Sequence, residues 1–341
     1  LLGKYKPSSE LADKGKLFGI KSGQVALVLD NELQDTKAIY EDNQVYLPVG
    51  WVNEYLNQRF YWDENEKLLV YALPDSIVYA DAETMGSSGP LLKVKEDGAY
   101  LSLGLVANYT DIRTEAFDTS QIKRVFIDTL WNPVPKVQAK RDGKLRTRGG
   151  VKSPIITDVA KGDRLTVLDA MEKWTKVRTE DGYMGYIENR RLEEQEPEPQ
   201  LSTFKAPVYT NISLGEPVIL AFHQVFSQEA NNKFEELIDK TEGVNVVVPS
   251  WFVMTDNQGN YSSIASRDYV EKAHARGIQV WAMLNNVSTK ESAAINTREL
   301  MGSTSNRKKL IASLMEDADN YGFDGINLDF EGLKAEAGPH Y

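Results

Sequence analysis

From Pro217 onward, short apolar runs alternate with longer stretches of helical periodicity. Strands are predicted in PVILAFHQVF from Pro217, VNVVVPSWF from Val244, IQVWAMLNN from Ile278 and the run around residues 323–333. Runs that are apolar on both faces are typical of parallel strands covered by helices. Four such units in succession predict a parallel sheet, either open or closed.

Capping residues mark where the helices of this region begin. Ser227 precedes QEANNKFEELIDKTEG, and Ser305 precedes NRKKLIASLMEDADNYG, so each serine is predicted to cap the helix that follows it. A further helix is predicted through residues 269–276. These helices fall between successive strands, which is the order that the parallel sheet requires.

The N-terminal part of the chain contains an internal repeat. YLPVGWVNEY from Tyr46 is echoed by YLSLGLVANY from Tyr100, and each copy leads to an apolar run, LLVYAL from Leu68 and KRVFIDTLW from Lys123. The repeat predicts a duplicated small α+β module over residues 1–134, with strands around one short helix in each copy. Packing is expected to explain the recurring residues, and a binding face is the alternative.

This repeat resembles the copper amine oxidase N-terminal-like module of bacterial surface proteins. The resemblance does not imply copper, because the chain has three histidines and none lies in this region. His223, in the first predicted strand, has no second histidine or acid nearby at metal-ligand spacing, and we expect it to be a core histidine rather than a ligand or base. No metal and no cofactor are expected.

Residues 135–193 break into short β runs separated by turn residues, which predicts a small β-barrel. GDRLTVLD, WTKVRT and DGYMGYI, in that order, resemble a bacterial SH3-like domain. Such domains commonly contact cell-wall peptides. Trp174, Tyr183 and Tyr186 are candidates either for a binding groove or for packing in the barrel.

An acidic, proline-rich segment, EEQEPEPQ, begins at Glu193. Alternating Glu and Pro disfavour both helix formation and strand pairing, so an extended, solvated linker is predicted over residues 194–214. It separates the N-terminal modules from the α/β region, residues 215–341.

Length and charge limit the possible functions. A chain of 341 residues is too long for one ordinary core, so several domains are expected. The 50 acidic residues exceed the 39 basic ones, which argues against nucleic acid as a partner and favours a neutral or cationic ligand. The absence of cysteine excludes disulfides, thiolate metal sites and cysteine nucleophiles.

Location is also predicted from composition. Cysteine-free chains are common among proteins exported by Gram-positive bacteria, so we expect an extracellular or cell-surface protein associated with the cell wall. No apolar run approaches the roughly 18 residues of a membrane span. The sequence opens on Leu1 rather than Met. We therefore expect an N-terminal signal or membrane anchor outside this sequence.

The most informative motif is FDGINLDFEGL at residues 323–333, where Asn327, Asp329 and Glu331 alternate with apolar residues. Alternation in a strand points the three polar side chains to one face. In a (β/α)8 barrel, catalytic groups lie at the carboxyl ends of the strands. Two carboxyls so close repel each other, so one is expected to keep its proton near neutral pH. A protonated Glu331 could then act as a general acid beside an ionised Asp329.

The motif resembles the fourth strand of glycoside hydrolase family 18, which carries D-x-x-D-x-D-x-E in an apolar frame. Asp324, Asp329 and Glu331 fill three of its four positions, and Asn327 replaces the second aspartate. The resemblance implies that Glu331 protonates the glycosidic oxygen. It also implies that Asp329 orients the 2-acetamido group of the substrate, whose carbonyl oxygen attacks the anomeric carbon. That route requires an N-acetylated sugar.

Two positions of the motif have a less direct role. Asn327 cannot share a proton with Asp329, so a shifted working pH range is expected; asparagine is familiar here in family members that hydrolyse spore and cell-wall material. Asp324 belongs to the catalytic pattern, or it ties the start of the strand to nearby backbone amides.

Other candidate contacts follow the second and third strands. Trp251 could stack on a sugar ring or pack in the core. Asn285 and Asn286 could contact substrate or belong to the loop.

Only four β/α units precede Tyr341, whereas a closed TIM barrel needs eight. The predicted architecture is therefore a multidomain chain: a duplicated α+β module, an SH3-like β-barrel and the first half of a (β/α)8 TIM barrel. The family's tyrosine that contacts the acetamido group, on a later strand, has no counterpart here. We expect this chain alone to be poorly active, with the other half in a longer protein or in another chain.

Three functions compete. The first is a secreted or surface-held hydrolase of β-1,4-linked N-acetylglucosamine glycans, in peptidoglycan or spore cortex rather than chitin, because the N-terminal modules suit wall targeting. The second is a non-catalytic glycan-binding surface protein with a chitinase-like barrel, against which Glu331 counts. The third, a purely structural surface protein, leaves the polar strand face unexplained. An N-acetylated polysaccharide or peptidoglycan is the expected partner.

Overall fold

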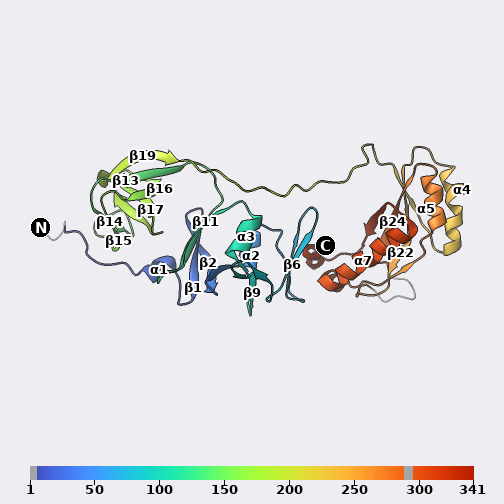
Figure 1. Ribbon diagram of the computed structural model, residues 1–341, viewed down its shortest axis with the longest axis horizontal. Helices are drawn as coiled ribbons and strands as arrows, with labels where there is room; N and C mark the ends of the chain where they lie inside the picture. Colours follow the sequence, from blue (N-terminus) through green and yellow to red (C-terminus); the bar gives the residue numbers. More distant parts are fainter. Residues whose placement is uncertain (1–5, 288–294) are drawn as a thin grey trace. The chain divides into compact units, whose positions relative to one another are not determined.

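The computed structural model describes residues 6–287 and 295–341 (Figure 1). The chain divides into two compact units, one made of Leu1–Trp62 with Leu69–Tyr209 and the other of Asp63–Leu68 with Thr210–Tyr341. The two N-terminal domains predicted from the sequence fall mainly in the first unit and the α/β region falls in the second. Their individual boundaries stay predictions.

A seven-stranded sheet with the order β11-β12-β1-β2-β3-β10-β9 carries the internal repeat (Figure 1). Its strands are β1 (Gln24–Leu29), β2 (Glu32–Glu41), β3 (Gln44–Pro48), β9 (Leu92–Lys95), β10 (Gly98–Ser102), β11 (Arg113–Phe117) and β12 (Arg124–Asp128). The other elements of this region are α1 (Lys14–Phe18), α2 (Val49–Tyr55), α3 (Leu103–Tyr109), β4 (Tyr61–Asp63), β5 (Leu68–Ala72), β6 (Ile77–Ala80), β7 (Met85–Gly86) and β8 (Gly89–Pro90).

Each copy of the repeat forms one strand followed by one short helix, β3 with α2 and β10 with α3. The two copies meet where β3 and β10 pair antiparallel, with Leu47 opposite Leu101. These leucines are fully buried, as are the recurring Val52 and Val106 on the two helices. Packing therefore explains these recurring residues, as expected.

A second seven-stranded sheet, in the order β15-β14-β18-β17-β16-β13-β19, forms the region predicted as SH3-like. Its elements are β13 (Val134–Ala139), β14 (Gly143–Arg146), β15 (Ile155–Val159), β16 (Arg164–Ala170), β17 (Trp174–Thr179), β18 (Met184–Glu188), η2 (Asn189–Arg191) and β19 (Leu192–Glu198). Tyr183 is buried against Phe18, with ring centroids 6.2 Å apart, so it contributes to packing. Trp174 and Tyr186 are half-buried.

The acidic segment differs in part from its prediction. β19 pairs antiparallel with β13, so the expectation that this segment cannot pair was wrong. β19 is an edge strand, and its pairing is irregular between Val134 and Lys136, which is where an edge strand can accommodate Pro197 without a backbone N–H. Its side chains beyond Leu192 are exposed, and residues 199–214 form neither helix nor strand. Part of this segment is held by the first unit, because the Ser202 hydroxyl donates to Asp111 at 2.5 Å and the Tyr209 hydroxyl donates to the Ala72 carbonyl at 2.7 Å. The linker over residues 194–214 stays a prediction.

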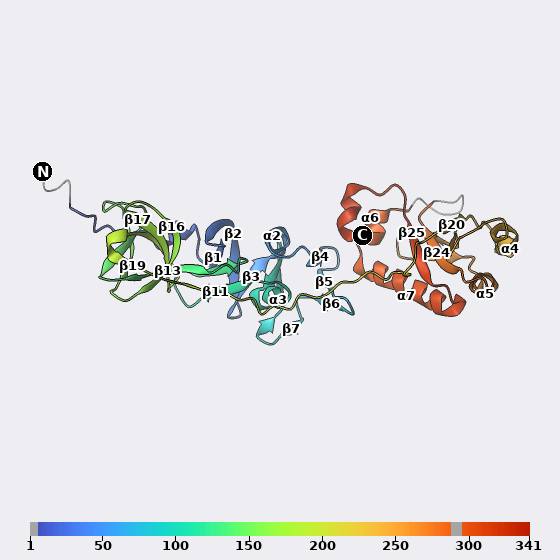
Figure 2. The ribbon, with the colours of Figure 1, turned by 90° about the horizontal axis from the view of Figure 1, so that it is seen from above.

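The C-terminal unit contains a six-stranded sheet in the order β20-β21-β24-β22-β23, with β25 paired to β24. Its elements are β20 (Leu220–His223), η3 (Gln228–Lys233), α4 (Phe234–Ile238), β21 (Val246–Pro249), β22 (Phe252–Met254), β23 (Tyr261–Ser263), α5 (Arg267–His274), β24 (Gln279–Asn285), α6 (Thr297–Met301), α7 (Thr304–Tyr321), β25 (Gly325–Asp329) and η4 (Ala335–His340). β20, β21, β24 and β25 pair in parallel, which confirms the predicted sheet. Figure 2 shows α5 and α7 on the same side of these strands.

Two details of this unit depart from the sequence pattern. Ser227 caps its helix as predicted, accepting a hydrogen bond from the Ala230 N–H at 3.3 Å. The cap of α7 is Ser303, which accepts from the Asn306 N–H at 3.2 Å, so the prediction of Ser305 was wrong by two residues. The predicted second strand is interrupted after Pro249, and the short hairpin of β22 and β23 follows it.

Candidate functional site

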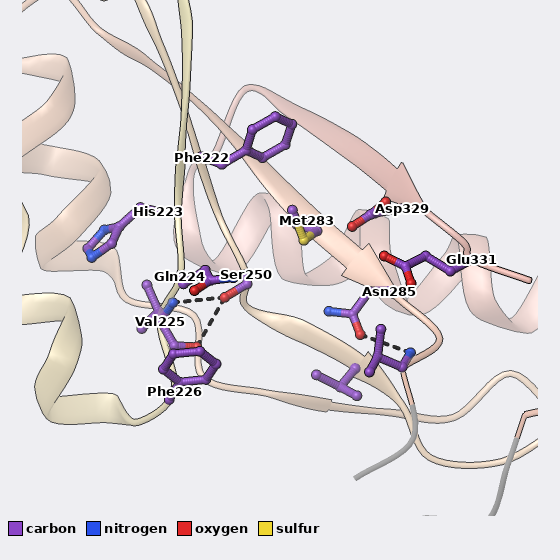
Figure 3. Close-up of a pocket in the computed structure, with 12 residues that line it drawn as sticks. Phe222, His223, Gln224, Val225, Phe226, Ser250, Met283, Asn285, Asp329 and Glu331 are labelled. Carbon is purple, nitrogen blue, oxygen red and sulfur yellow. Dashed lines mark hydrogen bonds between the residues drawn. The ribbon is translucent and has the colours of Figure 1, made fainter.

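A cavity of about 560 Å³ opens at the carboxyl ends of the parallel strands (Figure 3). Residues from β20, β22, β24 and β25 and from the loops after β20, β21, β24 and β25 line it: Phe222, His223, Gln224, Val225, Phe226, Ser250, Val253, Met283, Asn285, Val287, Asp329 and Glu331. Ligands of α/β proteins bind at this edge of the sheet, because the loops that follow the strands converge there. The volume is in the range of small-molecule sites.

The structure brings the two predicted acids together. Asp329 is the last residue of β25 and is half-buried, whereas Glu331 lies two residues beyond and is exposed. Figure 3 shows both carboxylates pointing into the cavity on the side of Met283. The alternation of side chains along β25 produces this arrangement, since positions two residues apart share a face. A carboxyl pair that shares one cavity can carry acid–base chemistry.

Asn285 also lies in the cavity lining, at the end of β24 and opposite Asp329 in the strand register. Its side chain is 9% exposed, and its Oδ1 accepts a hydrogen bond from the Val287 N–H at 3.2 Å (Figure 3). This bond holds the amide group at the cavity wall, where a polar ligand group could reach it. The predicted contact between Asn285 and substrate stays a prediction.

The other two residues of the motif are not part of the cavity lining. Asn327 lies two residues before Asp329 on β25, opposite Met283. Asp324 precedes the strand at its amino end, and its Oδ2 accepts a hydrogen bond from the Val280 N–H and lies 2.8 Å from His274 Nε2. Tying the strand to a backbone amide, one of the two roles predicted for Asp324, is the role that these contacts fit.

Trp251 requires a correction. Its side chain is 1% exposed and lies in the core of the C-terminal unit, where its Nε1–H donates to Asn231 Oδ1 at 2.8 Å. Its ring meets those of Tyr269 and Phe323 edge-on. Of the two roles predicted for Trp251, core packing is therefore the one observed, because a ring without an exposed face cannot stack on a sugar.

His223 lines the cavity, and its ring also contacts Tyr269. Its Nδ1 is 3.0 Å from the Tyr269 hydroxyl, and the two rings stack. Burial lowers the pKa of His223 and raises that of Tyr269, so both side chains are neutral at pH 7. His223 therefore has a structural hydrogen-bond partner, but it is half-buried at the cavity wall and not in the core as predicted.

Eight of the twelve residues that line the cavity were not predicted from the sequence, among them two exposed aromatic residues and a serine. Phe222 and Phe226 are 63% and 83% exposed, and the Ser250 Oγ accepts from the Val225 N–H at 2.8 Å and donates to the Val225 carbonyl at 3.1 Å (Figure 3). The signal for Phe222 was the strand alternation, since the ring of its neighbour His223 packs on Tyr269 of α5. Phe226 and Ser250 follow strand ends, which is where loop residues meet at a parallel sheet.

Among residues 6–287 and 295–341, no group of three or more His, Cys, Asp or Glu side chains is placed to hold a metal ion. In the same described ranges, no helix is both long and apolar enough to cross a membrane.

Comparisons with known proteins identify one domain by family. Residues 142–193 match the family model of the bacterial SH3 domain. The chain matches no curated protein.

The chain is also similar to several solved structures. One is the C-terminal domain of a protein described as a chitinase from Desulfitobacterium hafniense, with 24% identity, 33% of this chain and 34% of that chain covered, and a TM-score of 0.29. A chitinase from Bacteroides thetaiotaomicron has 17% identity, coverage of 36% and 38%, and a TM-score of 0.28. The spore cortex-lytic enzyme SleL of Bacillus cereus has 15% identity, coverage of 41% and 33%, and a TM-score of 0.29.

These likenesses are distant, and the chain spans about a third of the length of the solved chains that it matches. The protein is thus a multidomain chain with a bacterial SH3 domain at residues 142–193 and a C-terminal unit built on a mainly parallel sheet.

Proposed function

We propose that the C-terminal unit belongs to a glycoside hydrolase that cleaves β-1,4 bonds in N-acetylglucosamine-containing cell-wall glycan. The observation that carries the proposal is the placement of Asp329 and Glu331 in one cavity at the carboxyl ends of the parallel strands. The exposed ring of Phe222 in the same cavity supplies an apolar surface of the kind that packs against a sugar face.

In the proposed mechanism, Glu331 is the general acid and Asp329 orients the substrate. Glu331 gives its proton to the glycosidic oxygen as the bond to the anomeric carbon breaks, and the carbonyl oxygen of the 2-acetamido group attacks that carbon. Water then opens the cyclic intermediate and returns a proton to Glu331, so the anomeric configuration is retained. The sequence resemblance to glycoside hydrolase family 18 supports these roles, because Asp329 and Glu331 occupy the matching positions of the motif.

Cell-wall glycan is proposed as the substrate because of the N-terminal region. The bacterial SH3 domain at residues 142–193 supports a location at the wall, and the repeat resembles a module of bacterial surface proteins. Peptidoglycan or spore cortex is therefore proposed ahead of chitin, by association rather than from the chemistry of the site.

The test uses the complete protein that contains this chain, because the chain alone is expected to be poorly active. It compares wild type with the Glu331→Gln variant on purified peptidoglycan and on chitooligosaccharides, with products identified by mass spectrometry. Glu331→Gln keeps the shape of the side chain and removes its acid, so the products should disappear. Glu316→Gln, a matched change on the exposed face of α7, should leave them unchanged. Products that persist in Glu331→Gln would exclude Glu331 as the acid.

The substrate-assisted step has its own test. A chitooligosaccharide whose acetamido group is removed at the cleaved sugar should resist hydrolysis, because the internal nucleophile is then missing. Cleavage of that analogue at a rate close to that of the parent would contradict the proposed role of Asp329.

A glycan-binding protein without catalysis is the second candidate. Phe222 and Phe226 favour it, since exposed aromatic rings can hold a sugar without cleaving it. Binding of wall glycan by a wild-type protein that releases no products would establish this alternative.

A further inference from the structure

Asn286 makes an unusual pair of contacts at the edge of the cavity. Its side-chain Nδ2 donates to the carbonyl oxygen of Glu331 at 2.9 Å, and its Oδ1 accepts from the Glu331 N–H at 2.8 Å. The two bonds fix the orientation of the amide group, because a backbone N–H requires an oxygen and a carbonyl requires a donor. One side chain therefore satisfies both backbone groups of the residue that carries the proposed acid.

These contacts extend the sheet beyond its last backbone pair. The parallel pairing of β24 with β25 ends where Asn285 lies opposite Asp329. Glu331 lies two residues past that point. Within residues 6–287 and 295–341 no strand partner continues the ladder there, and the side-chain amide of Asn286 binds the backbone groups that a neighbouring strand would bind. Side chains of Asn readily make such local bonds with backbone groups.

The residues next to Glu331 show why its backbone needs this support. Phe330 packs against the core of the C-terminal unit, whereas Gly332 adopts φ +65°, in the left-handed region where the chain turns away. The Asn286 bonds lie between the packed residue and the turn. They hold the Glu331 backbone in a fixed position although its side chain is exposed.

We infer that Asn286 is a positioning residue, which sets the backbone of Glu331 so that its carboxyl group meets the glycosidic oxygen. The inference rests on the proposed function and names a residue that acts on the reaction through Glu331 without touching the substrate. Small displacements of a reacting group cost large factors in rate, about a hundredfold for roughly 1 Å. Loss of the two bonds should therefore lower kcat and leave KM nearly unchanged.

The experiment measures kcat, KM and amide hydrogen exchange for full-length wild-type protein and the Asn286→Ala, Asn286→Asp and Asn320→Ala variants. Asn286→Ala removes both bonds, and we expect kcat to fall by about tenfold to a hundredfold with KM within about threefold of wild type. Exchange at the Glu331 amide should become faster. Asn286→Asp can still accept from the Glu331 N–H and should slow that exchange again, as a partial rescue. Asn320→Ala, on the exposed face of α7, is the matched control and should change nothing.

The outcomes separate this inference from the proposed function. If Asn286→Ala has wild-type kcat while Glu331→Gln is inactive, the inference is overturned and the proposed function stands. Unchanged exchange at the Glu331 amide in Asn286→Ala would also overturn the inference, since the two hydrogen bonds from Asn286 to the Glu331 backbone would not exist in solution. A wild-type protein without hydrolytic activity would overturn both. A loss of kcat together with faster exchange at Glu331, with thermal unfolding near that of wild type, is the result that we expect.

Discussion

The two ends of β25 hold acids in opposite situations. At the amino end, the carboxylate of Asp324 is bound by the Val280 N–H and by His274, so its polar group is engaged by neighbouring elements of the fold. At the carboxyl end, it is the backbone of Glu331 that is bound, by Asn286, while the carboxylate points into the cavity (Figure 3). One motif thus contains an acid that holds the sheet together and an acid that is presented to a ligand.

This difference indicates how to divide a sequence motif into structural and chemical parts. Removal of a carboxylate that is bound to a backbone amide lowers the stability of the protein, because the amide then lacks a partner. A carboxylate that faces a cavity can be changed with little cost to folding and a large cost to chemistry. A similar contrast separates two neighbours on β20 that both line the cavity: the His223 ring is bound by Tyr269, whereas the Phe222 ring is 63% exposed.

Asp329→Asn should have a large effect on catalysis. The change keeps the size of the side chain and removes the charge that would orient the acetamido group, so kcat should fall by about a hundredfold or more. Steady-state hydrolysis of chitooligosaccharides measures this loss. Asp319→Asn, an exposed change on α7, is the control. An Asp329→Asn variant with wild-type kcat would remove Asp329 from the chemical part of the motif.

Asp324→Asn should change stability instead of chemistry. The neutral amide weakens the bonds to the Val280 N–H and to His274, and the free energy of unfolding should fall by about 1–3 kcal/mol. Urea denaturation of the full-length protein measures the loss, while kcat at a temperature where the variant is folded should remain close to wild type. A hundredfold loss of kcat in a stably folded variant would place Asp324 with the catalytic residues.

Phe222→Ala should weaken substrate binding moderately. The ring is 63% exposed, so its removal costs little folding energy but takes away apolar contact with a sugar, and KM should rise by about fivefold to tenfold. The control is Ile311→Ala, an exposed apolar residue on α7. Equal KM values for the two variants would show that sugar does not bind at Phe222.

The smallest effect concerns His223 and pH. Burial lowers the pKa of His223 below its ordinary value, so the unfolded chain binds a proton more readily than the folded one. Stability should therefore be unaffected above about pH 6.5 and should decrease as the pH falls from there through the lowered pKa. Denaturation curves of wild type and His223→Gln at several pH values measure this difference. A pH dependence that is the same in both proteins would contradict it.

The parallel sheet was predictable because four apolar runs alternate with helical stretches. The positions of Asp329 and Glu331 in a common cavity followed from strand alternation and the parallel order. The interruption after Pro249 was not predicted, because VNVVVPSWF is apolar throughout and periodicity does not mark where such a run ends. Ser303, Thr304 and Ser305 are all possible caps, so composition could not choose among them.

Side-chain direction was the part of the site that sequence alone could not give. Trp251 follows a strand end, as cavity residues do, yet its side chain donates a hydrogen bond to Asn231 and packs in the core. β19 pairs despite Pro197, because an edge strand tolerates a missing donor. The two hydrogen bonds of Asn286 join it to the backbone of Glu331, which is 45 positions further along the chain. No local sequence pattern predicts a contact between residues so far apart in the sequence.

The measurement that tests the central claim most directly is a comparison of Glu331→Gln with Asp324→Asn in one set of experiments on the full-length protein. For each variant, glycan hydrolysis and the free energy of unfolding are measured side by side. We predict that Glu331→Gln abolishes product formation with unfolding close to that of wild type, and that Asp324→Asn lowers the free energy of unfolding with kcat preserved. Hydrolysis that survives in Glu331→Gln, or that disappears equally in both folded variants, would contradict the division of the motif into a catalytic and a structural acid.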